Sequence, residues 1–365
     1  MKGQNYIPEY LPLDGDTYNV SSYVGELLKA TQRFTELKET INKSKVNADF
    51  LILPLLNQEA VSSTRIEGTQ VTIDEIYEAQ SADTEKNRNN QEALNYIDAL
   101  DHGGLYVREH GKITKQLIKE MHVLLMSNGV RGENKTPGLF KTTENFIGSK
   151  GSKREHAEFI PPGPDLTEAY IDNLVEYMNS DIDDDKILIK IAIIHAQFET
   201  IHPFLDGNGR IGRVLIPLFL MCKKELGRPF FFISKTLEKN QFQYYQNLNQ
   251  TRWEKNWDKW LSFFQLSVIK QCESTVELIK GVEELLDEDL DLLKQHHRHH
   301  QLEKYIQAVY ANPIFTINKI AEATGISYQV CRDYTFTLFE QNRIYKNSMQ
   351  RNTRYYNYRF LEKLR

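Results

Sequence analysis

HPFLDGNGRIGR, residues 202–213, is the stretch on which the interpretation of the whole chain depends. The glycines on either side of Asn208 allow the backbone to turn so that several N–H groups point at one anion. If a helix begins at this turn, its N-terminus adds partial positive charge in the same direction. The stretch therefore predicts an anion-binding loop formed by Gly207, Asn208 and Gly209.

Four charged or titratable side chains of the same stretch supply the other parts of a phosphate-transfer site. Arg210 and Arg213 lie three residues apart, so on a helix they share one face and can both contact phosphate oxygens. Asp206 offers a hard oxygen ligand for Mg²⁺. His202 is a candidate general base, because the ordinary pKa of histidine lies near neutrality. Together these groups are what a transfer at phosphorus needs.

Residues 207–212 also match G-x-G-x-x-G, the fingerprint of dinucleotide-binding folds. That fingerprint follows its strand directly and is followed about 20 residues later by an acidic residue at a strand end. Here residues 202–206 separate the apolar run from the first glycine, and the later position falls at Arg228 and Pro229. We therefore reject a Rossmann-type site.

Taken whole, residues 202–213 resemble the signature of the Fic family, His-Pro-Phe-x-Asp/Glu-Gly-Asn-Gly-Arg-x-x-Arg, at every fixed position. The residues that lead into the signature also follow the order typical of the family: His195, Phe198, Glu199 and Ile201. The resemblance extends over most of residues 30–270. It implies a mainly α fold, a Fic-type helical bundle with a small β-hairpin flap.

The resemblance implies a protein adenylyltransferase, which moves AMP from ATP to Ser, Thr or Tyr hydroxyls of target proteins and of itself. By motif position, His202 would deprotonate the target hydroxyl and Asp206 would hold Mg²⁺ on the α- and β-phosphates. The implied phosphate-binding residues are Gly207, Asn208 and Gly209 at the α-phosphate, Arg210 on the β-phosphate side and Arg213 at the γ-phosphate.

Residues 63–68, STRIEG, resemble the inhibitory motif of the family, Ser/Thr-x-x-x-Glu-Gly/Asn. Ser63, Glu67 and Gly68 occupy its fixed positions. The resemblance implies that Glu67 pairs with Arg213 and prevents placement of the γ-phosphate, so that the enzyme is autoinhibited. Without the catalytic signature, Glu67 would be read as an ordinary solvated helix charge.

Residues 140–160 place aromatic and aliphatic side chains around a polar, glycine-containing centre, which predicts two short strands around a mobile tip. The resemblance implies that this hairpin is the flap, which holds the main chain of a protein substrate by strand addition. A plain surface hairpin is the alternative. Tyr244 or Tyr245 would border the adenine of ATP, unless these rings simply belong to the core.

The rest of the chain predicts further helices, among them residues 18–48, 47–62 and 115–126. Residues 187–199 are apolar nearly all round, so periodicity leaves helix and strand open, and the resemblance favours the helix. We expect four parts: residues 1–90, a helical region with the inhibitory motif; 91–270, the Fic catalytic core; 271–301, an exposed linker helix; and 302–365, a winged helix-turn-helix domain.

The last of these parts has its own charge. Residues 302–365 contain ten Lys or Arg and five Asp or Glu, a net +5, whereas the whole chain carries −5. Helix, glycine turn, helix and hairpin is the order of a winged helix-turn-helix. This domain is expected to bind nucleic acid or a protein partner.

Composition favours a soluble, cytoplasmic protein with no membrane contact. There is no signal-peptide core, no run of about 18 apolar residues and no CxxC pair among the three cysteines. The histidines of residues 296–300 are interpreted as a solvated face and not as a metal site.

Three alternatives to an autoinhibited AMP transferase remain open from the sequence. The same site would serve an enzyme that removes AMP, or one that does both. A DNA-binding regulator with the Fic body as its sensor is a different class. A homodimer is compatible with each of these functions.

Overall fold

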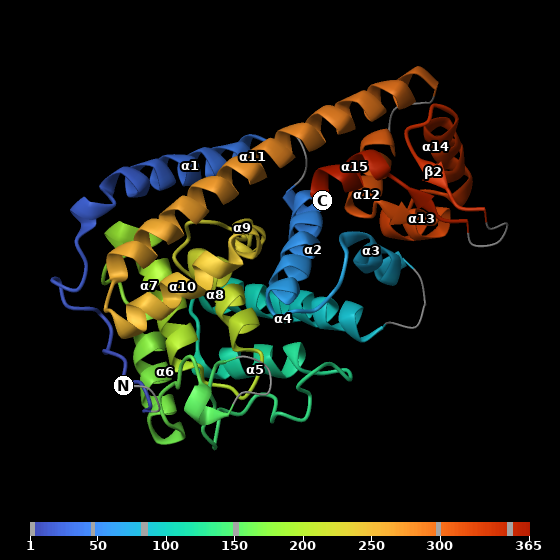
Figure 1. Cartoon of the computed structure of the whole chain (residues 1–365). Helices are drawn as coiled ribbons and strands as arrows, with labels where there is room; N and C mark the ends of the chain where they lie inside the picture. Colours follow the sequence, from blue (N-terminus) through green and yellow to red (C-terminus); the bar gives the residue numbers. More distant parts are fainter. Residues whose placement is uncertain (1–3, 45–47, 82–86, 149–152, 297–300, 349–352) are drawn as a thin grey trace.

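The structure is a computed structural model, and it describes residues 4–44, 48–81, 87–148, 153–296, 301–348 and 353–365. It is mainly helical, as the sequence predicts (Figure 1). The helices before the C-terminal part are α1 (Val24–Lys43), α2 (Ala48–Ile66), α3 (Ile73–Ser81), α4 (Arg88–His110), α5 (Lys115–Leu125), α6 (Pro164–Asn179), α7 (Ile187–Ile201), α8 (Asn208–Cys222), α9 (Ser234–Lys239), α10 (Gln241–Trp253) and α11 (Trp257–His296).

The centre of the bundle is the pair α7 and α8, joined by the turn that carries the signature. Every residue of α7 from Leu188 to Ile201 is buried, and this explains an apolar run with no polar face. The helical interpretation of residues 187–199 is therefore confirmed. Trp260 of α11 is completely buried beside α7 and donates its indole N–H to the carbonyl of Ala192, at 3.0 Å.

The long helix α11 differs from the exposed linker that the sequence predicts. It is continuous from Trp257 to His296, so the expected boundary between residues 270 and 271 falls inside a helix. Figure 1 shows α1 lying alongside it, and its later turns bury Leu286, Leu290 and Leu293 against the C-terminal part. The apolar positions missed in the sequence recur at helical spacing and give α11 a buried face along its whole length.

The C-terminal part contains α12 (Leu302–Ala311), β1 (Ile314–Phe315), α13 (Ile317–Thr324), α14 (Tyr328–Glu340), β2 (Tyr345–Lys346), β3 (Tyr355–Tyr356) and α15 (Tyr358–Leu364). Its three strands are antiparallel in the order β1-β3-β2. Gly325 ends α13 in the left-handed conformation, with φ 67°, and the side chain of Ser327 caps α14. The predicted sequence of helix, glycine turn, helix and hairpin is present at these residues.

The C-terminal part packs on α2 and α3, the helices that precede and follow Glu67 in the chain (Figure 1). Gln58 of α2 donates to the carbonyl of Leu364, and Arg365 pairs with Asp74 of α3. Lys319 donates to the carbonyl of Gln80, at 2.6 Å, from α13. The C-terminal part therefore contacts both of the helices between which Glu67 lies in the chain.

The flap is less regular than the sequence predicts. Instead of two strands, the described residues of this range, 140–148 and 153–160, contain one isolated antiparallel bridge between Ile147 and Phe159. The expected tip partly falls on residues 149–152, outside the described residues. Most of the histidine cluster, residues 297–300, also lies outside them.

Among the helices of the described residues, none combines the length and the apolar character that a membrane crossing requires.

Asp289 of α11 anchors the C-terminal part. It is 1% exposed, accepts from the Tyr310 hydroxyl at 2.8 Å and contacts the Arg359 guanidinium at 3.2 Å. Removing this carboxylate deprives the buried Tyr310 hydroxyl of its acceptor and leaves Arg359 paired with Glu288, which is about half exposed. We expect Asp289→Ala to lower the free energy of unfolding by about 2–4 kcal/mol, measured by urea denaturation.

Asp291→Ala is the matched control, because Asp291 pairs with Lys294 on the same helix but is 71% exposed. An exposed ion pair contributes roughly 0–1 kcal/mol to the free energy of unfolding. Equal urea midpoints for the two variants would contradict the anchoring role.

Candidate active site

The signature lies at the turn between α7 and α8, where two residues adopt the left-handed conformation. His202 ends α7 with φ 49°, and Gly207 precedes α8 with φ 77°. These two reversals bring the C-terminus of α7 and the N-terminus of α8 together. The first N–H groups of α8, from Asn208 onward, have no partner within the helix and form an anion-binding end.

The side chain of Asn208 holds this turn closed. It is 2% exposed, its Oδ1 accepts from the N–H of Phe204 at 2.8 Å, and its Nδ2 donates to the carbonyl of the same residue at 2.8 Å. Asp206 Oδ1 accepts from the N–H of Gly207 at 2.7 Å. Both ends of the Asn208 amide are therefore engaged with Phe204 inside the loop.

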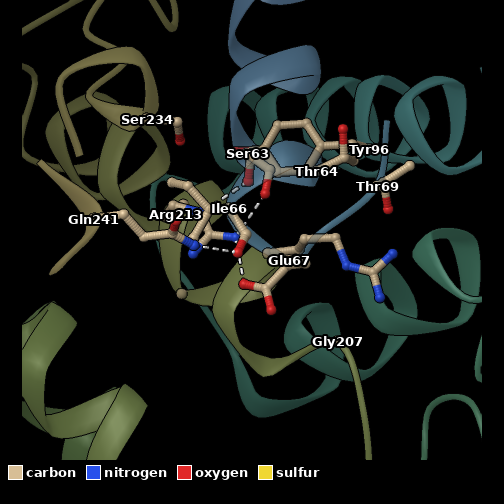
Figure 2. A network of polar contacts seen from close by, with 12 residues as sticks. Ser63, Thr64, Ile66, Glu67, Thr69, Tyr96, Gly207, Arg213, Ser234 and Gln241 are labelled. Atoms are coloured by element: carbon tan, nitrogen blue, oxygen red, sulfur yellow. Dashed lines mark hydrogen bonds and ion pairs between the residues drawn. The ribbon is translucent and has the colours of Figure 1, made fainter. Parts of the chain in front are cut away.

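Ser63, Glu67 and Arg213 meet at the start of α8, as the inhibitory motif implies (Figure 2). Arg213 donates to Glu67 Oε1 at 2.7 Å, to Ser63 Oγ at 2.8 Å and to the Ser63 carbonyl at 2.9 Å. A Cβ atom at Gly209 would collide with Glu67 Oε1. The Glu67 carboxylate thus occupies the anion-binding end of α8.

Burial and charge act against each other in this pair. Burial alone would raise the pKa of Glu67, but the charge and hydrogen bond of Arg213, with smaller effects of Arg210 and His202, bring it below its ordinary value. Burial alone would lower the pKa of Arg213, but the Glu67 carboxylate outweighs this effect and raises the pKa above the ordinary value of arginine. Both groups are therefore ionised at neutral pH.

Helix α2, which leads into Glu67, is itself anchored. Its buried Glu59 accepts from the N–H of Ser234 at 3.0 Å and from the hydroxyl of Tyr96 at 2.9 Å. At its end, the Ile66 carbonyl accepts from Gln241 Nε2 at 2.8 Å. These contacts to α9, α4 and α10 fix the position of α2 and therefore of Glu67 over α8.

Arg210 is a buried cation that lacks partners. It is completely buried, which lowers its pKa, and its Nε and Nη1 groups have no hydrogen-bond partner among the described residues. The nearest carboxylates are those of Asp206, at 3.6 Å, and Glu92, at 3.9 Å. Buried donors without partners are costly, so this guanidinium is suited to an anionic ligand.

His202 is neutral in this site. Burial, then the charges of Lys141 and Arg252, lower the pKa of His202 to about 3. Its Nδ1 is buried without a hydrogen-bond partner among the described residues. A neutral imidazole is the form that can accept a proton from a hydroxyl.

Asp206 is the one carboxylate of the turn that can reach a metal ion. Its side chain is 30% exposed, and the described residues contain no group of three metal-binding side chains. Mg²⁺ is commonly held by one or two carboxylates together with substrate phosphates and water. The donor set therefore fits Mg²⁺ bound with a nucleotide and does not fit an all-protein metal site.

The expectation that Tyr244 binds ATP is not supported by its position. Its ring is completely buried, and its hydroxyl lies 2.9 Å from His195 Nε2 within the core. The neighbouring Tyr245 is 40% exposed on α10. The helical turn directs one tyrosine inward and the next outward, which spacing alone left undecided.

Three residues that support the turn were missed in the sequence. His122 stacks on Phe204 at 3.7 Å, and its Nε2 lies 3.0 Å from the carbonyl of Asp206. Lys141 and Asn145, from the base of the flap, donate to carbonyls of the turn. His122 stands at an apolar position of the helix 115–125, and a polar residue at a core position was the available signal.

Comparison with known proteins agrees with this geometry. Residues 112–220 match the model of the Fic/DOC family, and residues 24–104 match that of the Fic/DOC family N-terminal region. Together the two matches cover more than half of the chain. The chain belongs to the Fic/DOC family.

Curated relatives include a probable protein adenylyltransferase from Aquifex aeolicus, 29% identical over 46% of this chain and 48% of that protein. Another is the protein adenylyltransferase fic-1 from Caenorhabditis elegans, 30% identical over 32% of this chain and 21% of that protein. The matches thus span less than half of the length of these relatives.

Solved structures of Fic proteins share the fold. A Fic family protein from Desulfovibrio desulfuricans has a TM-score of 0.57 at 18% identity, over 96% of this chain and 98% of that one. Residues 134–508 of Fic-1 from C. elegans have a TM-score of 0.53 at 20% identity, over 72% of this chain and 73% of that one.

The Asn208 side chain should be essential for the stability of the Fic turn. Asn208→Ala removes two buried hydrogen bonds to Phe204, and we expect it to lower the free energy of unfolding by about 2–3 kcal/mol. The control is Asn247→Ala, which removes an exposed bond to the Gln243 carbonyl. Urea denaturation of both variants makes the comparison, and a similar loss in each would contradict the assignment.

Proposed function

We propose that the chain transfers AMP from ATP to hydroxyl side chains of target proteins and of itself, and that Glu67 restrains this activity. The observation that carries the proposal is the Arg213–Glu67 ion pair at the N-terminus of α8, beside a neutral His202. A carboxylate held by an anion-binding helix end and an arginine stands where a phosphate would bind. The names of the curated relatives support the same reaction.

In the proposed reaction, the target hydroxyl oxygen bonds to the α-phosphorus of ATP, pyrophosphate leaves, and the proton passes to His202. The N–H groups at the start of α8 stabilise the negative charge that grows on the α-phosphate. Arg210, whose guanidinium is buried and incompletely partnered, contacts the adjoining phosphates. Triphosphate charge near His202 raises the pKa of its imidazole, which makes it a stronger base.

Mg²⁺ is proposed to bind through Asp206 together with phosphate oxygens, where it neutralises their charge. The partly exposed Asp206 carboxylate supports this assignment. Tyr245 is the proposed neighbour of the adenine in place of Tyr244, because its ring is exposed. The target main chain is proposed to add beside the bridge between Ile147 and Phe159.

We further propose that residues 302–365 are a winged helix-turn-helix that contacts protein and not nucleic acid. Supporting this, four of its basic side chains already contact the rest of the chain: Lys319, Arg343, Arg359 and Arg365. These contacts use much of the positive charge that the sequence offers to a polyanion.

Glu67→Gly should raise AMP transfer by roughly 10- to 100-fold. The reason is that Arg213 cannot pair with Glu67 and a γ-phosphate together, and a charge-assisted pair is worth about 1.5–3 kcal/mol, with tenfold for each 1.4 kcal/mol. Arg213→Ala should lose activity in either background. The measurement is intact mass of the protein and of candidate targets after incubation with MgATP.

The control for this change is Glu254→Gly, because Glu254 also follows the last residue of a helix but its side chain is exposed. Its rate should equal that of the wild type. A flat or lower rate in folded Glu67→Gly would overturn autoinhibition, and would favour an enzyme that uses Glu67 to remove AMP.

His202→Ala should abolish transfer and leave ATP binding largely intact, because the change removes the base and no phosphate contact. Transfer is measured in the Glu67→Gly background, and ATP affinity by calorimetry. If AMP accumulates on the protein at the rate of the Glu67→Gly parent, His202 is not the base.

A further inference from the structure

Lys141, at the base of the flap, has an unusual position for a lysine. It is 3% exposed, and its ammonium forms no salt bridge with any of the residues that the structure describes. Its Nζ donates to the carbonyls of Ile201 and His202 and to Asn145 Oδ1, each at 3.0 Å. Its backbone N–H donates to the carbonyl of Pro203 at 2.8 Å. One residue thus contacts three consecutive residues around the proposed base.

The carbonyls that Lys141 contacts lie at the C-terminal end of α7. The last carbonyls of a helix have no partner within the helix, and they carry its partial negative charge. His202 adopts the left-handed conformation of a helix cap there, with φ 49°, and its N–H donates to the carbonyl of Phe198 at 3.0 Å. The carbonyls of Ile201 and His202 lie beyond that bond and receive no N–H of α7. A buried cation satisfies these carbonyls instead, and it matches the sign of the helix dipole.

We propose that Lys141 is a positioning residue for the reaction, which holds His202 in place by capping the C-terminus of α7 from the flap. This inference rests on the proposed function for its kinetic consequences. Asn145 assists from the same segment, because its Nδ2 donates to the carbonyls of His202, at 3.1 Å, and Phe204, at 2.8 Å. The backbone on both sides of the imidazole is therefore fixed by the flap.

The hydrogen-bond count indicates that Lys141 is charged. Three acceptors surround Nζ, and only the ammonium form has three N–H donors. A neutral amine would turn its lone pair toward one of these oxygens. Burial lowers the pKa of Lys141 to about 7, with an opposing effect of Glu144, so the full set of bonds is present below that pH and is lost as the pH rises through it.

The same charge acts on the proposed base. The charged groups that face His202 are Lys141 from the flap, Arg252 from α10 and Glu67 from the end of α2. The two cations favour the neutral imidazole, and Glu67 opposes them. Lys141 therefore combines two effects, the placement of the ring and the preference for its unprotonated form.

The test compares Lys141→Met with its parent, the full chain carrying Glu67→Gly. Methionine retains the length and the apolar stem and removes the ammonium. We expect kcat for AMP transfer to fall on the order of 100-fold, as for a displaced catalytic group. KM for ATP should change little, because the phosphate contacts come from α8. The pKa of His202, followed by NMR titration of labelled histidine and assigned with His202→Ala, should rise toward its ordinary value.

Asn145→Ala separates placement from charge. It removes two donors to the turn and one of the three acceptors of Lys141, but it leaves the ammonium and its bonds to Ile201 and His202 in place. We therefore expect kcat to fall by about 10-fold with little change in the His202 pKa. This variant also decides the matter if Lys141→Met does not fold. Lys119→Met is the matched control: the Lys119 ammonium lies 4.4 Å from the ring centroid of Phe140, the residue before Lys141, and among the described residues it donates no hydrogen bond to the turn. Its kcat and His202 pKa should equal those of the parent.

The proposal is overturned if folded Lys141→Met keeps the kcat of the parent, or if its His202 pKa does not rise. A loss of kcat accompanied by an equal loss of ATP affinity would also overturn it, because that result describes general damage to the site. If the Glu67→Gly parent transfers no AMP, the proposed function fails, and the NMR titration still decides whether Lys141 acts on His202.

Discussion

The guanidinium of Arg213 is buried, and much of the site depends on this single constraint. A buried cation without a counter-charge is strongly destabilising, so Arg213 must always have an anionic partner. In this structure the partner is Glu67, which reaches the N-terminus of α8 from a different helix. The need to satisfy one arginine therefore couples α2 to the signature turn. Under the proposed function, a phosphate at the same place would pair with Arg213 as Glu67 does, so that the carboxylate and the substrate would compete for one side chain.

The turn itself is held by residues that need not touch a substrate. Asn208 closes it from within, His122 stacks on it from α5, and Lys141 and Asn145 bind its carbonyls from the flap. Each of these satisfies a backbone group that two left-handed residues leave without a regular partner. Rigid α7 and α8, buried in the core, set the distance between the base and the helix N-terminus. Such support is what fixes a catalytic geometry within fractions of an ångström.

The C-terminal part is joined to the inhibitory segment more closely than an independent domain would be. It packs on α2 and α3, and Asp289 of α11 anchors it through Arg359 and Tyr310. The expected linker belongs to the continuous helix α11, which packs against both the helical bundle and the C-terminal part. Four of the ten basic residues that suggested a polyanion partner contact the rest of the chain: Lys319, Arg343, Arg359 and Arg365. Tertiary packing therefore places part of this positive charge in contacts within the chain.

The sequence by itself determined which residues make up the signature turn, because residues 202–213 are contiguous, and their types and spacing predict an anion-binding loop beside a histidine. It also predicted the mainly α class and the helix, glycine turn, helix and hairpin of residues 317–358, but not α12, β1 or α15. Only the tertiary structure decided which of Tyr244 and Tyr245 faces outward, that residues 140–160 form a single bridge, and that Lys141 caps α7. These outcomes depend on contacts between segments far apart in the chain, and local propensity carries no information about such partners.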